Sequence, residues 1–188
     1  FFLSPEFFAK GISEILEQKD DFGKNEHCKG MRALVEYTQP NPFKEFHIGH
    51  LVNNAVGEAI SRIIEFCGAE TTRVTYHGDV GLHVAKSVWG LHHLGINPTS
   101  TAELGRAYSE GDKAYTEDEK VKKEITELNK KIYEKSDAQV NALYEQGRHI
   151  SLAHFETLYK RLGSSFDGHF FESEAGVLGK KLVEENIG

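Results

Sequence analysis

Long apolar runs are absent from this 188-residue sequence, and cysteine and methionine are scarce, with two and one residues respectively. No stretch of about 18 uncharged apolar residues occurs, so a membrane-spanning helix is excluded. Cys28 and Cys67 form no CxxC pair, and His27-Cys28 has no second pair at ligand spacing, so we predict no protein-bound metal. Thiols of this kind stay reduced in the cytosol, and we expect a cytoplasmic protein.

Positive charge is also in short supply, because 22 Lys and Arg residues against 29 Asp and Glu residues give a net charge of −7. A domain that held nucleic acid by itself would show a basic footprint. We therefore expect any RNA contact of this segment to be local, or to be made by other parts of a longer protein. The first residue is Phe1 rather than Met, and we expect the sequence to be a fragment.

Local signals predict an α/β fold whose first half is a strand–helix–strand unit. Ser4-Pro5 marks the start of a helix that reaches about Gln18, because Ser is a common N-cap and Pro is favoured at the first helical position. Two strands then flank a long helix that ends near Gly68. The short loops predict parallel strands joined by a right-handed crossover. The expected ranges are 33–37 and 71–76 for the strands, and 47–66 and 82–94 for the helices.

The long helix carries apolar residues at spacings of three and four, which predicts one continuous apolar face. We expect this face to bury against the sheet, since each buried aliphatic side chain contributes about 1.5–3 kcal/mol. Its members are Ile48, Leu51, Val52, Ala55, Val56, Ala59, Ile60, Ile63 and Ile64.

Residues 96–163 are predicted to form a helical insertion. Ser100 with Glu103 and Thr116 with Glu119 both fit capping boxes. An apolar stripe among many Lys and Glu residues predicts one long amphipathic helix or a helical pair, with its charges as a solvated face rather than a partner site. The stripe consists of Val121, Ile125, Leu128 and Ile132. Beyond the break at 163–165, we expect a return to the sheet at 166–171 and a last helix at 174–185.

The strongest functional signal, Pro-Asn-Pro-Phe-Lys-Glu-Phe-His-Ile-Gly-His-Leu, lies at residues 40–51 between the first strand and the long helix. In parallel α/β sheets, ligands bind where strands end and helices begin. A helix N-terminus offers free N–H groups and partial positive charge, which suit a polyphosphate. His47 and His50 share one face of the opening turn, where each ring can donate a hydrogen bond to phosphate. Gly49 lacks a Cβ and lets a nucleotide approach the backbone.

This arrangement suits the attack of a carboxylate on the α-phosphate of ATP, which needs charge stabilisation rather than a protein nucleophile. The competing interpretation is that the two histidines only cap a helix. The strand before the motif, the extended Pro-Asn loop and the long helix after it favour the ATP site. Lys44 in the same loop is a further candidate for a phosphate contact.

The span from Val35 to Leu51 resembles the class I arginyl-tRNA synthetases, in which a five-residue spacer joins a Pro-Asn pair to an HxGH signature. Asn41 to His47 has this spacing. Residues 2–4, 78–79, 166–167 and 171–173 are similar to the same family. The resemblance implies a Rossmann-like parallel sheet of the class I synthetase catalytic domain with a helical insertion, which residues 1–188 would form in part.

The resemblance also implies ATP and L-arginine as substrates, with Mg²⁺ accompanying ATP, and tRNA(Arg) as a partner of the intact enzyme. It assigns His47, Gly49 and His50 to ATP, with both histidines catalytic, and Glu36 and Asn41 to arginine. A carboxylate at a strand end can pair with a guanidinium through two hydrogen bonds, which agrees with this role of Glu36. The alternatives are a surface charge for Glu36 and an Asx turn for Asn41.

Some positions depart from the family pattern. Val52 stands where the family often has Arg, Val80 replaces the Trp of its Gly-Asp-Trp-Gly turn, and His83 stands where Gln is frequent. These changes leave the class assignment intact but weaken the case for adenosine or tRNA-end contacts there. Asp79 stays open between a ligand contact and turn stabilisation. No KMSKS-like loop or helical anticodon-binding domain occurs, so we expect these residues alone to be inactive or nearly so.

Two other functions fit parts of the sequence. A small HxGH nucleotidylyltransferase would need a second basic phosphate motif near its C-terminus, and Lys180-Lys181 is a poor candidate. A non-catalytic interaction module would use the charged helices around 116–160. The synthetase hypothesis covers most of the chain, and it predicts an aminoacyl-tRNA ligase.

Overall fold

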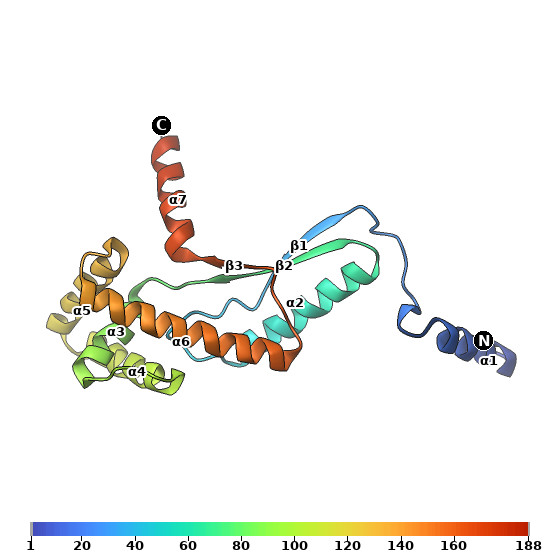
Figure 1. Ribbon diagram of the computed structural model, residues 1–188, viewed down its shortest axis with the longest axis horizontal. Helices are drawn as coiled ribbons and strands as arrows, with labels where there is room; N and C mark the ends of the chain where they lie inside the picture. The colour runs from blue at the N-terminus through green and yellow to red at the C-terminus, as the bar shows by residue number, and fades with distance from the viewer. Residues whose placement is uncertain (1, 188) are drawn as a thin grey trace.

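The computed structural model describes residues 2–187 and shows a three-stranded parallel sheet with helices around it (Figure 1). In spatial order the strands are β1 (Arg32–Glu36), β2 (Glu70–His77) and β3 (Gly168–Phe171). The helices are α1 (Pro5–Gln18), the short 3-10 helix η1 (Lys19–Asp21), α2 (Ile48–Phe66), α3 (Leu82–Leu94), α4 (Thr101–Glu117), α5 (Glu119–Glu134), α6 (Ala138–Leu162) and α7 (Glu172–Asn186). The predicted α/β fold with parallel strands and a helical insertion is confirmed.

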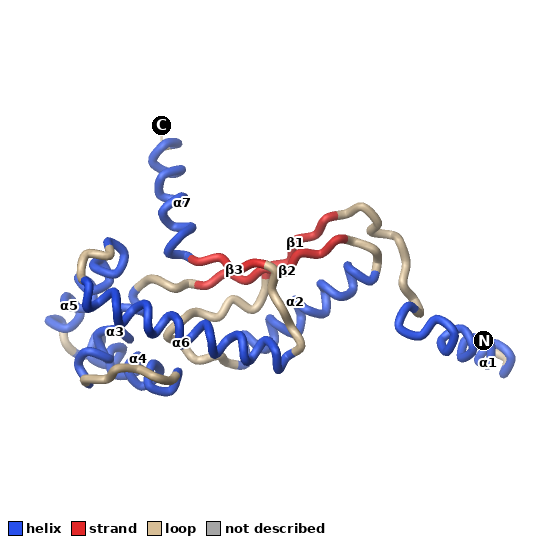
Figure 2. The backbone as a smooth tube through the Cα atoms, in the orientation of Figure 1, coloured by secondary structure: helices blue, strands red, loops and turns tan. Residues whose placement is uncertain are grey.

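Alternation along the paired strands divides the sheet into two faces. The register pairs Glu36 with Val74 and Tyr76 with Phe170, so these four side chains share one face. On that face, the side chains of Leu34 and Phe170 are 66% and 52% exposed. Figure 2 shows the strands at the centre of the molecule, with α2 and α6 on the same side of them.

The opposite face of the sheet receives α2 and α6. Arg73 of β2 forms ion pairs with Glu58 and Glu65 of α2, at 3.5 Å and 2.8 Å. His77 lies four residues further along β2 on the same face, and its ring stacks on Phe155 of α6 with ring centroids 6.1 Å apart. Helices α2 and α6 thus cover one face of the sheet, and Leu34 and Phe170 are exposed on the other.

The apolar stripe of α2 does not pack on the sheet, and the prediction that it would is wrong. The buried residues of α2 are instead Asn54, Gly57 and Ser61. A Cβ atom on Gly57 would lie 2.2 Å from Cγ of Tyr37, so the helix backbone sits directly against this ring. The exposed members of the stripe include Ile48 at 72%, Val52 at 56%, Val56 at 54% and Ile63 at 63%.

Hydrogen bonding explains why the polar side of α2 faces inward. The amide of Asn54 donates to Oγ1 of Thr38 and accepts from Oγ of Ser164, both at 2.8 Å. The hydroxyl of Ser61 donates to the carbonyl of Gly57 at 2.8 Å. Buried polar groups satisfied in this way cost little, and the small side chains allow a closer approach than an aliphatic face would.

The insertion contains three helices, α4 to α6, rather than the predicted single helix or pair, and they pack on α3. Their common core includes Val84, Ala85, Val88, Leu91, Leu104, Ala107, Ile125 and Ile132. Ile125 and Ile132 belong to the predicted apolar stripe, so the stripe is confirmed as the inner face of α5. Figure 1 shows α6 extending from this helical group toward the sheet and α2.

One of the two predicted capping boxes is present. The hydroxyl of Ser100 accepts from the Glu103 N–H at 3.4 Å, and the Glu103 carboxylate accepts from the Ser100 N–H at 3.1 Å. The Thr116 box is wrong, because Thr116 lies inside α4 and donates to the Asp112 carbonyl at 2.9 Å. Asp118 caps α5 in its place, since its carboxylate reaches two N–H groups of the first turn.

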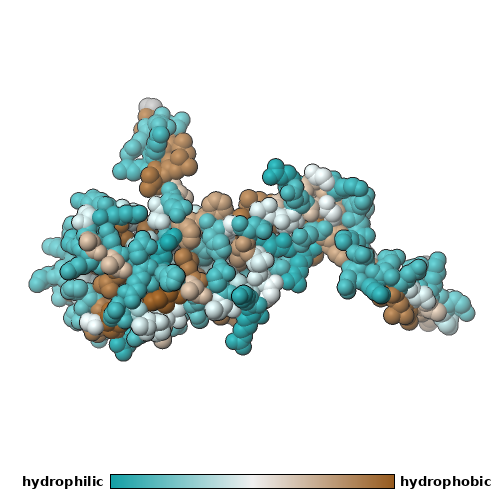
Figure 3. Space-filling model, viewed as in Figure 1, coloured by the Kyte–Doolittle hydropathy of each residue, from teal (hydrophilic) through white to brown (hydrophobic). Residues whose placement is uncertain are grey.

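Two terminal helices carry exposed apolar side chains. Figure 1 shows α1 beyond a long loop at one end of the molecule and α7 projecting away from β3. Brown patches mark both helices in the space-filling view (Figure 3). The exposed side chains are Phe7, Phe8, Ile12, Ile15 and Leu16 on α1, and Val177, Leu178, Leu182 and Val183 on α7.

The two cysteines are free thiols, as predicted, although their backbones are joined by a 2.8 Å hydrogen bond from Cys28 N to Cys67 O. Cys67 is the C-cap of α2, one residue before the predicted cap Gly68, which follows it with φ 94°. Within residues 2–187, no helix has the length and apolar character needed to span a bilayer. The same residues hold no cluster of three or more His, Cys, Asp or Glu side chains suited to a metal ion.

Candidate active site

The two histidines of the HxGH motif stack on each other at the start of α2. His47 is the N-cap and His50 lies in the first turn, with ring centroids 3.8 Å apart and planes inclined by 25°. Nδ1 of His47 accepts from the Gly49 N–H at 3.1 Å, and Nδ1 of His50 accepts from the His47 N–H at 3.2 Å. Since both Nδ1 atoms accept, the neutral rings carry their protons on Nε2. Each ring can therefore cap the helix through Nδ1 and still offer Nε2–H as a hydrogen-bond donor.

The environment of His50 keeps this ring neutral. Partial burial, with the neighbouring charges of His47 and Lys44, lowers the pKa of His50 below its ordinary value. A neutral ring at pH 7 holds the capping bond through Nδ1 and offers one Nε2–H donor. His47 is exposed, and its Nε2 is not used in the capping bond.

The local structure gives a second reason for glycine at position 49, in addition to the approach of a nucleotide expected from the sequence. A Cβ atom at this position would lie 2.9 Å from Cε1 of His47. A larger residue would push the His47 ring out of its capping position. The glycine therefore allows the two imidazoles to stack over the first turn.

A pocket of about 330 Å³ opens beside His47, between the start of α2 and the end of α6. Its polar lining includes the guanidinium-bearing side chain of Arg161 from α6. The sequence analysis did not single out Arg161, because it lies more than a hundred residues from the motif. The apolar lining consists of Phe46, Ile48, Leu51, Leu158 and Leu162.

Glu36 ends β1 on the open face of the sheet, where its side chain is exposed. Its carboxylate accepts a hydrogen bond from the side-chain amide of Gln39. Tyr76 of β2 lies on the same face. Burial, and the negative charges of Glu172, Asp79 and Glu36 around it, raise the pKa of the Tyr76 phenol. Carboxylates of Glu36, Glu172 and Asp79 thus gather around Tyr76 at the carboxyl edge of the sheet.

Asn41 connects the loop after β1 to the loop after β2. Its Oδ1 accepts from the Gly78 N–H at 3.1 Å, so the Asx-turn alternative does not describe its main contact. A Cβ atom on Gly78 would lie 2.9 Å from Oδ1 of Asn41 and 3.2 Å from Oε2 of Glu172. The carboxylate of Glu172, at the junction of β3 and α7, therefore lies beside Asn41 across a glycine.

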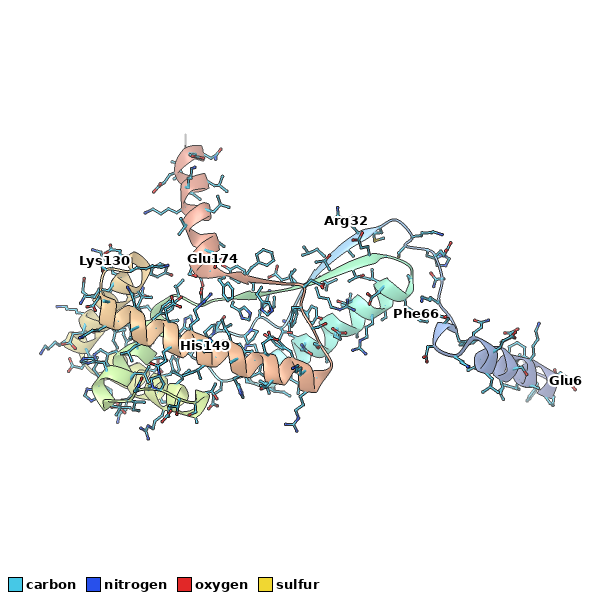
Figure 4. The ribbon with its side chains drawn as sticks, viewed as in Figure 1. Glu6, Arg32, Phe66, Lys130, His149 and Glu174 are labelled. Carbon is cyan, nitrogen blue, oxygen red and sulfur yellow. The ribbon has the colours of Figure 1, made fainter. Side chains whose placement is uncertain are left out.

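Glu172 and Tyr76 were missed as candidates in the sequence. Glu172 directly follows the third predicted strand, and an acidic residue at a parallel strand end is the signal that was available. Glu172 lines a pocket of about 620 Å³, together with Tyr133, Arg148, Lys130 and Glu174. Lys130 at the end of α5 and Glu174 at the base of α7 mark two sides of this region (Figure 4).

Asp79 is a buried structural residue. Its fully buried carboxylate accepts from Arg148 Nε at 2.8 Å, Tyr144 Oη at 3.2 Å, and both N and Oγ of Ser173 at 2.9 Å and 2.7 Å. All these partners come from α6 and α7, far along the chain. Of the two roles left open by the sequence, the structure supports stabilisation of the turn.

The remaining positions near the motif have defined contacts. Lys44 is exposed, with Nζ 5.5 Å from the centroid of the Tyr108 ring. Lys86 is engaged elsewhere, because its Nζ lies 2.7 Å from the Asp112 carboxylate. Nε2 of His83 lies 3.0 Å from the Gly78 carbonyl, and burial lowers the pKa of this ring. His83 thus supports the Gly78 turn.

Most of the chain matches a known group of proteins. The family described as tRNA synthetases class I (R), catalytic domain, matches residues 11–175. The chain belongs to this family. The match supports the synthetase hypothesis over the nucleotidylyltransferase and interaction-module alternatives.

Relatives of this synthetase-family chain include proteins named arginine–tRNA ligase. The one from Treponema pallidum is 32% identical over 188 residues, which cover 95% of this chain and 32% of the relative. The one from Clostridium perfringens is 31% identical over 191 residues, which cover 98% of this chain and 34% of the relative. The chain thus spans about a third of the length of these curated relatives.

Solved structures of arginyl-tRNA synthetases share the fold. The Thermus thermophilus structure superimposes with a TM-score of 0.61 at 27% identity, over 82% of this chain and 26% of that one. The Plasmodium falciparum structure gives a TM-score of 0.62 at 23% identity, over 92% of this chain and 29% of that one. The expected class I catalytic-domain fold is therefore confirmed.

Proposed function

We propose that this chain is the part of an arginine–tRNA ligase that binds ATP and L-arginine for the formation of arginyl-adenylate. In that reaction a carboxylate oxygen of arginine attacks the α-phosphorus of ATP, and the bond to the departing pyrophosphate breaks. The intact enzyme then transfers arginine to tRNA(Arg) in the cytoplasm. The observation that carries the proposal is the stacked His47–His50 pair at the start of α2, the helix that follows the Glu36 end of β1.

On this proposal, His47 and His50 stabilise charge on the phosphates through their Nε2–H groups. Preorganised donors of this kind act where negative charge develops in the transition state. Gly49 keeps the rings stacked, and Lys44 adds a mobile positive charge from the preceding loop. Mg²⁺ enters with ATP as the counter-ion of its phosphates.

Arginine recognition is assigned to the carboxyl edge of the sheet. Glu36 is exposed and its carboxylate can accept two parallel hydrogen bonds from a guanidinium. Asn41, held by the Gly78 N–H, presents its amide nitrogen as a donor for the carboxylate of the amino acid. The exposed carboxylate of Glu36 favours arginine over neutral amino acids.

Calorimetric titration of the chain with arginine, lysine or cysteine in the presence of ATP tests this proposal. We expect arginine to bind most tightly, and Glu36→Gln to weaken its binding roughly 10- to 100-fold, since a charged hydrogen bond contributes about 1.5–3 kcal/mol. Glu70→Gln is the matched control, because Glu70 is also exposed but begins β2 at the other end of the strands.

Each part of the proposal has its own contrary result. Unchanged arginine affinity in Glu36→Gln, in a chain that binds arginine, would remove the role of Glu36. Equal affinity for lysine and arginine would remove the assignment of the amino acid. No binding of either ATP or arginine by the folded chain would contradict a site formed by these residues.

A further inference from the structure

Phe43 occupies an unusual backbone conformation in the loop that carries the site. Its φ is 66°, in the left-handed region, although it has a bulky side chain, and it is 1% exposed. Such a conformation is strained for a non-glycine residue and persists where surrounding contacts determine it. Phe43 lies between Asn41 and Lys44, so whatever holds Phe43 also sets the backbone of these two residues.

The contacts that hold Phe43 come from one face of α6. The Phe43 N–H donates to Oγ of Ser151 at 3.0 Å, and the Ser151 hydroxyl donates to the Gly147 carbonyl at 2.8 Å. A Cβ atom on Gly147 would lie 2.3 Å from Cε1 of Phe43, so the ring fills the space that this glycine leaves. The Tyr144 ring stacks on the Phe43 ring at 6.2 Å. We call Tyr144, Gly147 and Ser151 the Phe43 seat.

The same face of α6 also holds the neighbouring turn. Arg148 and Tyr144 both donate to the buried Asp79 carboxylate. Asp79 directly follows Gly78, whose N–H donates to Oδ1 of Asn41. Asn41 is therefore fixed from two directions, through Phe43 along its own loop and through Gly78 across the sheet edge, and both connections end on α6.

We propose that α6 is a positioning element for amino-acid recognition, and that the Phe43 seat sets the placement of Asn41 and Lys44 in the site. The proposal gives the helical insertion a role beyond covering α3. The expected effect on arginine binding rests on the function proposed above. The expected ordering of residues 38–47 does not depend on that function. Residues of the seat touch Phe43 rather than substrate, so they are positioning residues.

The test measures two quantities in each variant of the full 188-residue chain: hydrogen exchange of residues 38–47 and arginine affinity with ATP present. We expect Gly147→Ala to expel the ring, increase exchange in 38–47 at least tenfold and weaken arginine binding at least tenfold. The double variant Gly147→Ala with Phe43→Leu removes Cε1 and Cζ, the two closest clashing atoms. We expect it to recover most of the lost affinity.

Ile125→Ala is the control for loss of stability. Ile125 is fully buried in the insertion core on α5 and is not part of the seat. We expect this variant to lower the melting temperature while exchange in 38–47 and arginine affinity stay within twofold of the wild type. A general loss of stability would instead change all variants alike.

Ser151→Ala serves as the second variant if Gly147→Ala fails to fold, because it adds no atoms to the seat and deletes the hydroxyl that accepts from the Phe43 N–H and donates to the Gly147 carbonyl. Unchanged exchange in 38–47 and unchanged affinity in a folded seat variant would overturn the proposal. Failure of the double variant to recover affinity would also overturn it. If the wild type binds no arginine, the proposed function fails for this chain, and the exchange measurement alone decides whether α6 orders the loop.

Discussion

Arg148 donates a 2.8 Å hydrogen bond from Nε to Oδ2 of Asp79, and the Asp79 side chain is completely buried while that of Arg148 is 20% exposed. Removing one partner of a buried ion pair leaves the other charge uncompensated, which costs roughly 3–5 kcal/mol. We expect Arg148→Met to lower the free energy of unfolding by about this amount, measured by urea denaturation followed by circular dichroism.

Arg106→Met is the matched control for this substitution. Arg106 is exposed on α4, and we expect its replacement to change stability by no more than about 0.5 kcal/mol. Equal effects of the two substitutions would show that the Asp79–Arg148 pair contributes nothing specific.

Substitutions on the two sides of α2 should change the stability of the fold by different amounts. Gly57→Ala places a methyl group against the Tyr37 ring, and overpacking of this kind costs about 1–3 kcal/mol. Val56→Ala, one residue earlier, removes an exposed side chain and should change stability by less than about 0.5 kcal/mol. Thermal unfolding of both variants measures the difference. A larger loss in Val56→Ala would mean that the apolar stripe is the packed face after all.

Stability should fall as the pH falls below about 6.5, the ordinary pKa of histidine. Burial lowers the pKa values of His50, His77 and His83 in the folded chain. Between each lowered pKa and about 6.5, the unfolded chain binds more protons than the folded one, so acid favours unfolding. Urea denaturation at pH 7.5, 6.5 and 5.5 measures this loss, with up to about 1.4 kcal/mol per pH unit for each histidine.

His77→Asn tests the share of this pH dependence that comes from His77, the most buried of the three rings. His77 is fully buried, and Nδ1 lies 2.7 Å from the Pro40 carbonyl, a contact that the asparagine amide can replace. We expect a weaker pH dependence in this variant. His92→Gln, at an exposed position on α3, should behave like the wild type, and the same slope in both variants would exclude His77 as a source.

These residues alone should not catalyse arginine-dependent exchange between ATP and pyrophosphate above background. The sequence offers one candidate phosphate-binding element, the HxGH motif at 47–50, and no second basic motif of that kind. Binding without chemistry is therefore the expected behaviour, measured by incubation with ATP, arginine, Mg²⁺ and labelled pyrophosphate. Robust exchange that His47→Ala abolishes would refute this prediction.

Local structure could be predicted closely from the sequence. The strands, α1, α2 and α3 follow from capping residues, glycine breaks and apolar spacing, which act within a few residues. The errors also have local causes. At 116–119 two plausible caps lie two residues apart, and Asp118 rather than Thr116 captured the free N–H groups of α5. The pattern of α2 identified its apolar side correctly but could not show which side the sheet would receive.

The sequence by itself determined the order of strands and helices and pointed to the family, and it supplied the candidate residues His47, Gly49, His50, Glu36 and Asn41. Only the tertiary structure decided that Glu172, Tyr76 and Arg161 join them, and that α6 holds Phe43. Phe43 and Ser151 are 108 residues apart, yet they share a buried hydrogen bond. Contacts over such separations depend on how the helices pack, because small residues such as Gly57 and Gly147 set how closely two backbones approach.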